Sequence, residues 1–346
     1  MNKELKIFGV VAFFTLLLYW GVEPFAHSQM HKHVEGHNLK YDGTADVAEV
    51  AHAIEKIKED AKKADKKPDQ AKLDALAKKE EAKKAFWAEV ATIGKLKGDA
   101  TKGEAAFATC AGCHNDAAGD MGGVIPPALD HAGSLYDRNY LIALIKDPAM
   151  AMNTDHKFAD TSMHPMGAIK SMMTDNQQIA DVVAFLKSKK NGDVSPRDAF
   201  VESCGRCHAN RYDKWTQVGF VPKTKSNIKT GQDIDNLKFL QEVAVQQGKI
   251  ADYMGKLPPD LSMIARARSH HFLHTFIENP QSQLHGTAMP RVGLSDNGMH
   301  KVMEYLEFTG DPSKPAREAA GPWVIGFFIL FTILAYLWKS SLWRDL

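Results

Sequence analysis

The sequence predicts an all-α protein in which two tandem helical domains lie between two apolar terminal segments. Three observations predict this fold: a Cys-x-x-Cys-His motif occurs twice, the segments after the two motifs repeat one another, and the longest uncharged stretches stand at the two ends. The 346 residues allow two small domains with accessory segments. Lys and Arg total 43 and Asp and Glu total 42, so the net charge of +1 gives no electrostatic basis for binding nucleic acid.

The first predicted element, residues 1–25, is an N-terminal transmembrane anchor. Residues 7–22 are uncharged and apolar, and Lys3 and Lys6 precede them. A cleaved signal peptide has the same pattern. No small-x-small cleavage site follows, because the chain continues EPFAH over residues 23–27. We therefore favour a retained anchor.

Residues 26–96 are predicted to form a His-containing linker and a helical hairpin. His27, His31, His33 and His37 form either a metal-binding cluster or, as we favour, a polar stretch at the membrane surface. Over residues 46–93, apolar residues recur at steps of three and four on both sides of Pro68, which predicts two helices. Their thin apolar stripe either docks on a partner or belongs to a solvated spacer.

Each of the two domains contains one complete Cys-x-x-Cys-His motif. This is the attachment signature of c-type haem, in which two thiols bond the vinyl groups and the adjacent histidine bonds the iron. The motifs use all four cysteines, so none remains for a zinc site or a disulfide. We therefore expect two covalently bound haem c groups, held by the following residues: Cys110, Cys113 and His114 in the first domain, and Cys204, Cys207 and His208 in the second.

The two motif-bearing segments, residues 97–191 (the first copy) and 192–316 (the second copy), repeat one another. IPPAL at 125–129 matches LPPDL at 257–261, and residues 140–148 match 272–280 at the same offset. A helix start precedes each motif, at Thr101 with Glu104 and at Ser195 with Pro196. Last helices are expected over 174–186 and 295–306.

This order of elements is that of the small all-α class I cytochrome c fold: helix, motif, loop, helix, ligand loop, helix. Phe107 and Phe200 stand at equivalent places ahead of the cysteines, and Phe185 and Tyr305 stand at equivalent places on the last helices. The second copy carries an insertion over about residues 209–256, whose role the sequence leaves open.

An electron-carrying haem needs a second axial ligand, and methionine is the usual choice because its thioether favours ferrous iron and raises the potential. Met289, followed by Pro290 just before the last helix, is the candidate in the second copy. In the first copy we prefer Met163, and Met166 and His164 remain alternatives.

Groups around the haem are predicted from the same repeat. A backbone carbonyl normally accepts a hydrogen bond from the second nitrogen of a ligating imidazole. Pro126 and Pro258 are expected to supply that carbonyl. The alternative is that the proline pairs serve only as tight turns. A haem propionate requires a cationic partner, and either Arg266 or Arg268 is in place to supply it. An ordinary exposed arginine is the alternative.

The last element, residues 317–346, is a predicted C-terminal transmembrane anchor. Residues 321–338 carry no charge, and Lys339 and Arg344 follow them, which favours a cytoplasmic C-terminus. A buried helix of a soluble domain is the alternative. With both termini in the cytoplasm, the haem domains lie in the periplasm of a bacterial inner membrane, where haem c is attached.

Two stretches resemble a known family. Residues 258–268, PPDLSMIARAR, are similar to the corresponding part of cytochrome c1, the haem subunit of cytochrome bc1 complexes, and residues 336–344 resemble its membrane tail. The resemblance covers roughly residues 195–346. It implies that Cys204, Cys207, His208 and Met289 hold a c1-type haem, and that Arg268 lies near a propionate.

The second haem domain, the hairpin and the N-terminal anchor depart from ordinary cytochrome c1. The chain is more similar to the dihaem cytochrome c subunits of some bacterial bc complexes. The resemblance implies a subunit that is not catalytic alone, and that takes electrons from the Rieske iron-sulfur protein beside a cytochrome b subunit. It would pass them to a soluble or oxidase-bound cytochrome c, in a complex that is usually dimeric.

Two other functions are weighed against this one. The dihaem subunit of a cbb3-type oxidase also carries two such domains, but its anchor is N-terminal, so residues 321–338 argue against it. A dihaem peroxidase must leave one iron open to hydrogen peroxide, and methionine candidates in both copies argue against that.

Overall fold

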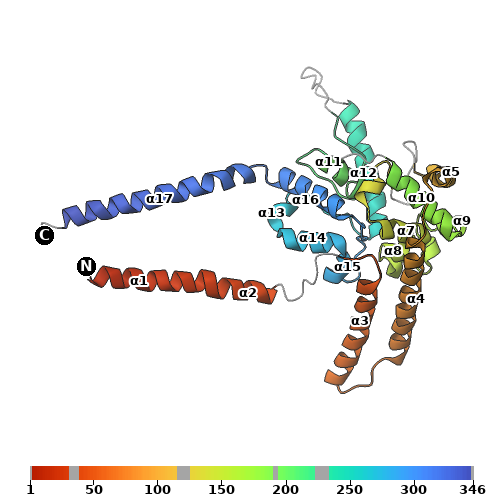
Figure 1. The fold of residues 1–346 in the computed structure, drawn as a ribbon, viewed down its shortest axis with the longest axis horizontal. Helices are drawn as coiled ribbons and strands as arrows, with labels where there is room; N and C mark the ends of the chain where they lie inside the picture. The colour runs from red at the N-terminus through yellow and green to blue at the C-terminus, as the bar shows by residue number, and fades with distance from the viewer. Residues whose placement is uncertain (1, 31–38, 115–124, 190–193, 223–233, 344–346) are drawn as a thin grey trace.

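The computed structural model describes residues 2–30, 39–114, 125–189, 194–222 and 234–343. Over these ranges the chain is mostly helical and forms no β-strand, only isolated bridges. The predicted all-α class is therefore confirmed. A helical body lies at one end of the molecule, and two long helices extend from it in the same direction (Figure 1).

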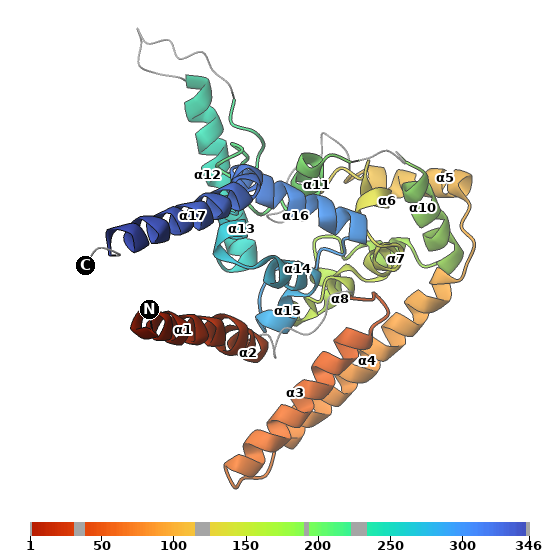
Figure 2. The same ribbon diagram turned by 60° about the vertical axis from the view of Figure 1, so that its left-hand side comes forward.

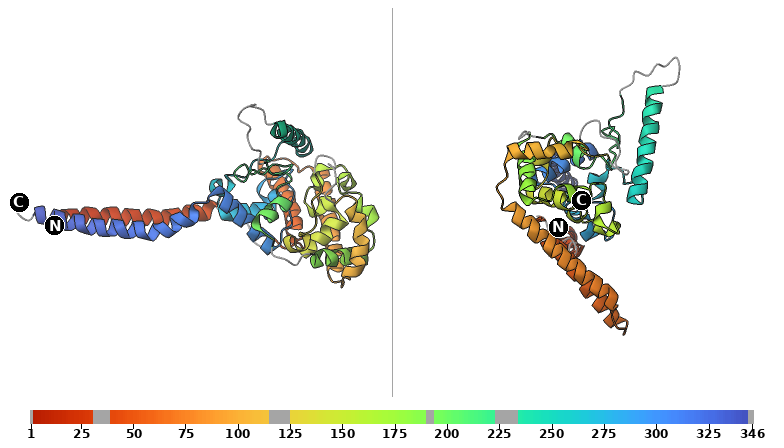
Figure 3. Two further views of the ribbon diagram at one scale, coloured as in Figure 1. Left: turned by 90° about the horizontal axis from the view of Figure 1, so that it is seen from above. Right: turned by 90° about the vertical axis from the view of Figure 1, so that its right-hand side faces the viewer.

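The two extended helices are the terminal segments. The N-terminal one comprises α1 (Asn2–Leu17), a π-helical turn η1 (Leu18–Val22) and α2 (Glu23–Met30), and the C-terminal one is α17 (Lys314–Leu342). Both chain ends lie at the far tip of these helices (Figure 3), where Lys339 pairs with Glu4. Stretches of 24 residues (Lys3–Ala26) and 29 residues (Lys314–Leu342) are long and apolar enough to cross a membrane, and neither is buried in the protein.

The predicted hairpin is formed by α3 (Thr44–Lys63) and α4 (Gln70–Gly94), which project from the body (Figure 2). Asp69 caps α4 by accepting the N–H of Lys72 at 3.2 Å. Gly43 begins α3 with φ of 87°, and a Cβ there would fall 2.4 Å from the Trp87 ring. The base of the hairpin is buried in the body, so the hairpin is more than a solvated spacer. The histidines from His27 to His37 lie outside the residues whose side chains the structure describes.

The first copy contains two main helices that cross at close range, α5 (Ala100–Ala111) and α10 (Asn176–Ser188). Asp99 caps α5 by accepting from the N–H groups of Thr101 and Lys102, so the expected start at Thr101 is wrong by two residues. An aspartate one residue before the helix competes effectively for this position. Between them lie the following shorter elements: α6 (Ala132–Leu135), α7 (Arg138–Lys146), α8 (Pro148–Ala151), η3 (Asp155–Lys157), η4 (Thr161–Met163) and α9 (Ile169–Met172).

The second copy repeats this order. Ser195 caps α11 as predicted, by accepting the N–H of Asp198 at 3.1 Å. Its elements are α11 (Pro196–Ser203), α12 (Ile234–Met254) in the insertion, α13 (Ile264–Ala267), α14 (His270–Glu278), α15 (Pro280–Gln283) and α16 (Asp296–Gly310).

The aromatic residues at equivalent places of the two copies form ring contacts, which the sequence did not predict. The ring centroids of Phe107 and Phe185 are 5.2 Å apart, and those of Phe200 and Tyr305 are 4.5 Å apart. In each copy the helix before the motif therefore packs on the last helix through the same pair of positions.

The two copies share one hydrophobic core with the hairpin base. The N–H of Ser295 donates to the carbonyl of Leu135 at 2.8 Å, and the N–H of Asp137 donates to the carbonyl of Gly293 at 2.9 Å. The two motifs are consequently held on one body and not on independent domains joined by a linker.

Candidate haem-binding sites

The two Cys-x-x-Cys-His motifs form the same turn. In the first copy the N–H of His114 donates to the carbonyl of Cys110 at 2.9 Å, and in the second the N–H of His208 donates to that of Cys204 at 3.0 Å. Each turn closes a helix, α5 or α11. The chain thus presents two thiols and an imidazole within one helical turn in both places, which is the donor set that covalent haem attachment uses.

Each motif histidine is oriented by a proline carbonyl. Nδ1 of His114 donates to the carbonyl of Pro127 at 2.9 Å, and Nδ1 of His208 donates to that of Pro259 at 2.8 Å. A proton on Nδ1 leaves the lone pair of Nε2 free for iron. This arrangement fits haem ligation by both histidines.

Pro126 and Pro258 were expected to supply the accepting carbonyl. In both copies that prediction is wrong by one residue, because the carbonyl of the next proline accepts instead. Each proline fixes its own φ and restricts the residue before it, so the pair is an extended segment with two carbonyls at different angles. The sequence shows the rigid pair, but it does not show which carbonyl faces the ring.

The surroundings of both imidazoles lower their pKa, which favours the neutral form. Burial lowers the pKa of His208, against the opposing effect of the bond to Pro259. Burial also lowers the pKa of His114, and the positive charge of Arg206 lowers it further. A neutral imidazole is the form that binds a metal.

The start of the insertion braces the second motif, which the sequence did not reveal. Trp215 donates from Nε1 to the carbonyl of Gly205 at 2.9 Å, and a Cβ on Gly205 would fall 2.6 Å from that indole nitrogen. Gln217 donates to the carbonyl of Cys207 at 3.2 Å. Side chains of the insertion thereby hold the backbone of the motif at Gly205 and Cys207.

The methionine candidates differ in exposure. Met289 is half-buried, and its N–H donates to the Thr287 hydroxyl at 3.2 Å. Met163 ends η4 with 65% of its surface exposed. Met166 is half-buried and packs against the hydrophobic core.

His164, between the two methionines of the first copy, is buried. Its Nδ1 accepts the N–H of Met166 at 3.0 Å, and burial lowers its pKa to about 4. The imidazole is therefore neutral and fixes the backbone of this loop.

Arg268 and Arg266 are both exposed. The guanidinium of Arg268 lies over the ring of Phe272, 5.4 Å from its centroid. This contact holds the arginine near the start of α14.

Arg206 is a charged residue that the motif analysis missed. It stands inside the second motif, yet its positive charge acts to lower the pKa of two residues of the first copy, His114 and Tyr136. Its Nε is buried and has no hydrogen-bond partner among the described residues. The first motif has Gly112 at the equivalent position, and this difference was the available signal.

A second polar contact joins the copies beside the motifs. Nδ1 of His131, from the loop after the first proline pair, lies in close contact with Oε1 of Glu202, two residues before Cys204. Burial raises the pKa of Glu202, and the hydrogen bond with His131 opposes that rise.

Comparisons with known proteins identify a cytochrome c domain in the first copy. The cytochrome c family model matches residues 100–190. The chain is 26% identical over 190 residues to the ammonia monooxygenase gamma subunit of Nitrosomonas europaea, which covers 42% of this chain and 80% of that protein. A chain of a solved hyperthermophilic respiratory complex III is 28% identical and is covered to 75%, against 44% of this chain, with a TM-score of 0.33. The match to the family model shows that residues 100–190 contain a cytochrome c domain, and such a domain carries covalently attached haem c.

Proposed function

We propose that this protein is a membrane-anchored dihaem cytochrome c that transfers single electrons within a bc1-type quinol–cytochrome c oxidoreductase. The observation that carries the proposal is the duplicated site. His114 and His208 each end a Cys-x-x-Cys-His turn, and each is oriented by the second carbonyl of a proline pair. A chance motif in the second copy would have no reason to reproduce that brace.

In this proposal the chain has five parts: the anchor 1–25, the linker and hairpin 26–96, cytochrome c domains at 97–191 and 192–316, and the anchor 317–346. Each domain holds one haem c by its two cysteines and its motif histidine. Met289 would complete the coordination of the second iron, and a residue of the segment from Met163 to Met166 would complete that of the first. When bound, haem c supplies a one-electron couple, and the protein supplies ligands, orientation and electrostatics.

The chain's residues tune that couple in two ways. The proline carbonyls on His114 and His208 fix the imidazole tautomer and strengthen each ligand. The shared core fixes the two motifs relative to one another, so little rearranges when charge moves.

Membrane topology supports a place in a respiratory complex. The two apolar helices extend from one side of the body (Figure 3), which would place both haem domains in the periplasm if both helices span the inner membrane. The proposed partners are cytochrome b, the Rieske protein as electron donor and a soluble or oxidase-bound cytochrome c as acceptor, in a dimeric complex. The likeness of residues 258–268 to cytochrome c1 supports this choice.

The test begins with purification of the protein from its native membrane in mild detergent. We expect two haems c for each chain, co-purified haem b and a Rieske signal, and reduction of the c haems by added quinol. One haem for each chain would refute the dihaem proposal. A copper-containing oxidase, with c haems reduced only by a soluble donor, would favour the cbb3-type alternative.

Matched variants assign the haems. Replacing Cys110 and Cys113 by Ser is expected to leave one haem, and replacing Cys204 and Cys207 by Ser is expected to leave the other. The two single-haem proteins then give separate spectra and potentials.

A further inference from the structure

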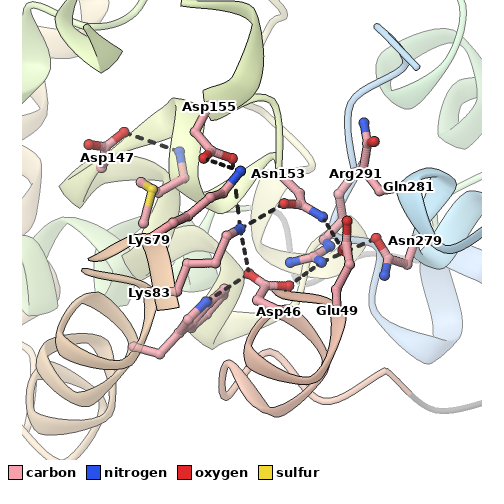
Figure 4. A network of polar contacts seen from close by, with 12 residues as sticks. Asp46, Glu49, Lys79, Lys83, Asp147, Asn153, Asp155, Asn279, Gln281 and Arg291 are labelled. Carbon is pink, nitrogen blue, oxygen red and sulfur yellow. Dashed lines mark hydrogen bonds and ion pairs between the residues drawn. The ribbon is translucent and has the colours of Figure 1, made fainter. Parts of the chain in front are cut away.

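A buried network of charges lies at the base of the hairpin, where three parts of the chain meet (Figure 4). Asp46 of α3 and Arg291 of the second copy form an ion pair, and they expose only 1% and 2% of their surfaces. Trp87 of α4 donates from Nε1 to Asp46 at 2.8 Å. The hairpin therefore forms a buried ion pair with a residue that lies two positions after Met289.

Arg291 is fixed by its backbone as well as by its side chain. Its N–H donates to the carbonyl of Met152 at 2.9 Å, and its own carbonyl accepts the hydroxyl of Tyr140 at 2.8 Å. The guanidinium also donates to Asn279 at 3.2 Å. Only Pro290, whose φ is locked, separates this anchored residue from Met289.

The same network reaches the first copy. Lys83, buried on α4, donates to Asn153 at 2.8 Å and lies 3.7 Å from Asp155. Asn153 in turn donates to Glu49 of α3 at 3.0 Å. One hairpin thus holds the segment after α8 in the first copy and the methionine loop of the second.

Energetics argue against a purely stabilising role. Removing ions from water is costly, and a well-packed apolar substitute for a buried pair often leaves stability unchanged or higher. Hydrogen bonds to a charged group fix both the position and the orientation of the side chains that make them, and an apolar substitute does not reproduce this. The network lies where direction matters, beside the candidate ligand of the second haem.

We propose that the hairpin base is a positioning device for the sixth ligand of the second haem. Asp46 holds Arg291, and Arg291 holds the loop so that the Met289 thioether would reach the iron of a bound haem. Asp46 and Arg291 are positioning residues and do not themselves touch the haem. The inference rests on the proposed function, since it requires a haem in the second copy.

The experiment uses the full holoprotein in mild detergent. Three readouts are taken for each variant: haems per chain, the long-wavelength charge-transfer band of methionine-ligated ferric haem, and the midpoint potentials. Met289→Ala shows the effect of losing the ligand itself: one haem is expected to lose its charge-transfer band, and its midpoint potential is expected to fall. Asp46→Ala and Arg291→Met are expected to reproduce both effects with two haems still attached, and Arg291→Lys is expected to restore them in part.

Arg138→Met is the matched control. Arg138 donates to the carbonyls of Gly94 and Leu96, so it ties the end of α4 to the first copy without contacting the methionine loop. It is expected to lower thermal stability and to leave the band and both potentials unchanged. If Asp46→Ala lowers stability and leaves the band and potentials unchanged, or if Arg138→Met removes the band as well, the hairpin is only structural and the inference is wrong.

Two further outcomes are kept distinct. If Asp46→Ala does not accumulate, Asp46→Asn, which removes the charge and keeps the shape, decides by the same readouts. If wild type carries one haem, or Met289→Ala leaves the band intact, the haem or ligand assignment of the proposed function fails, whatever the hairpin does.

Discussion

The ring of Tyr140 in the first copy occupies the space that a side chain on Gly293 in the second would need. Gly293 has φ of 74°, and a Cβ built on it would fall 2.0 Å from the tyrosine ring. Tyr140 is also hydrogen-bonded to Arg291, two residues earlier. The contact between the copies is therefore steric as well as polar at this point.

Gly293→Ala is predicted to destabilise the contact between the copies. Overpacking costs about 1–3 kcal/mol, and a left-handed φ adds to it for any residue with a Cβ. Thermal unfolding of the holoprotein measures the loss. Gly286→Ala is the control, because Gly286 has the same φ of 74° and nothing within 4 Å of the added Cβ. Equal losses from the two variants would mean that backbone conformation alone is responsible.

The Asp46–Arg291 pair predicts a pH dependence. Burial acts to raise the pKa of Asp46, but the charges of Arg291 and Lys83 and the hydrogen bonds outweigh it and hold the pKa below its usual value. The contribution of the ionised Asp46 to stability is thus complete above the unfolded pKa, about 3.9, and is lost as the pH falls through the lower folded value.

Asp46→Asn is accordingly predicted to lower the free energy of unfolding by about 3–5 kcal/mol at neutral pH, because it leaves a buried charge unpaired. The deficit should narrow once the pH falls below about 4. Thermal unfolding from pH 3 to 8 tests this. Glu55→Gln, which breaks the exposed pair with Lys58, should change little at any pH. A deficit that stays constant down to pH 3 contradicts the prediction.

The order of helices was predictable from the sequence because it depends on local signals. Motif spacing, proline stops and apolar periodicity identified the repeat, including the equivalent places of Phe107 and Phe200 ahead of the cysteines. Ser195 was recognised as a helix cap for the same reason. Such features need only a few neighbouring residues.

The contacts that the sequence did not predict are those between distant segments. Asp46 and Arg291 stand 245 positions apart, and nothing in either neighbourhood indicates that they meet. The choice of Pro127 over Pro126 depends on carbonyl angles, which the residue types do not encode by themselves. The sequence predicted that the hairpin is either a docking element or a spacer. It did not show the buried base, because the residues that meet there are distant in the sequence.

Arg206→Gln is predicted to lower the potential of the first haem. A nearby cation favours the reduced iron, so removal of its charge should lower the potential. Spectroelectrochemical titration of the two-haem protein measures this. Arg211→Gln is the control, since Arg211 is exposed and pairs with Asp260. A shift confined to the second haem would show that the charge of Arg206 acts only within its own motif.

Met163 and Met166 are alternative ligands of the first haem, and the Ala variant of each residue is the control for the Ala variant of the other. Met163 was preferred from its position in the sequence, but 65% of its surface is exposed, whereas Met166 packs against the core. A thioether already held by packing loses less rotamer freedom on binding iron, so burial favours Met166. Met166→Ala is therefore expected to remove the charge-transfer band and lower the potential of the first haem, and Met163→Ala to leave both unchanged. The reverse result would restore Met163, and retention of the band in both single variants would show that neither methionine is required.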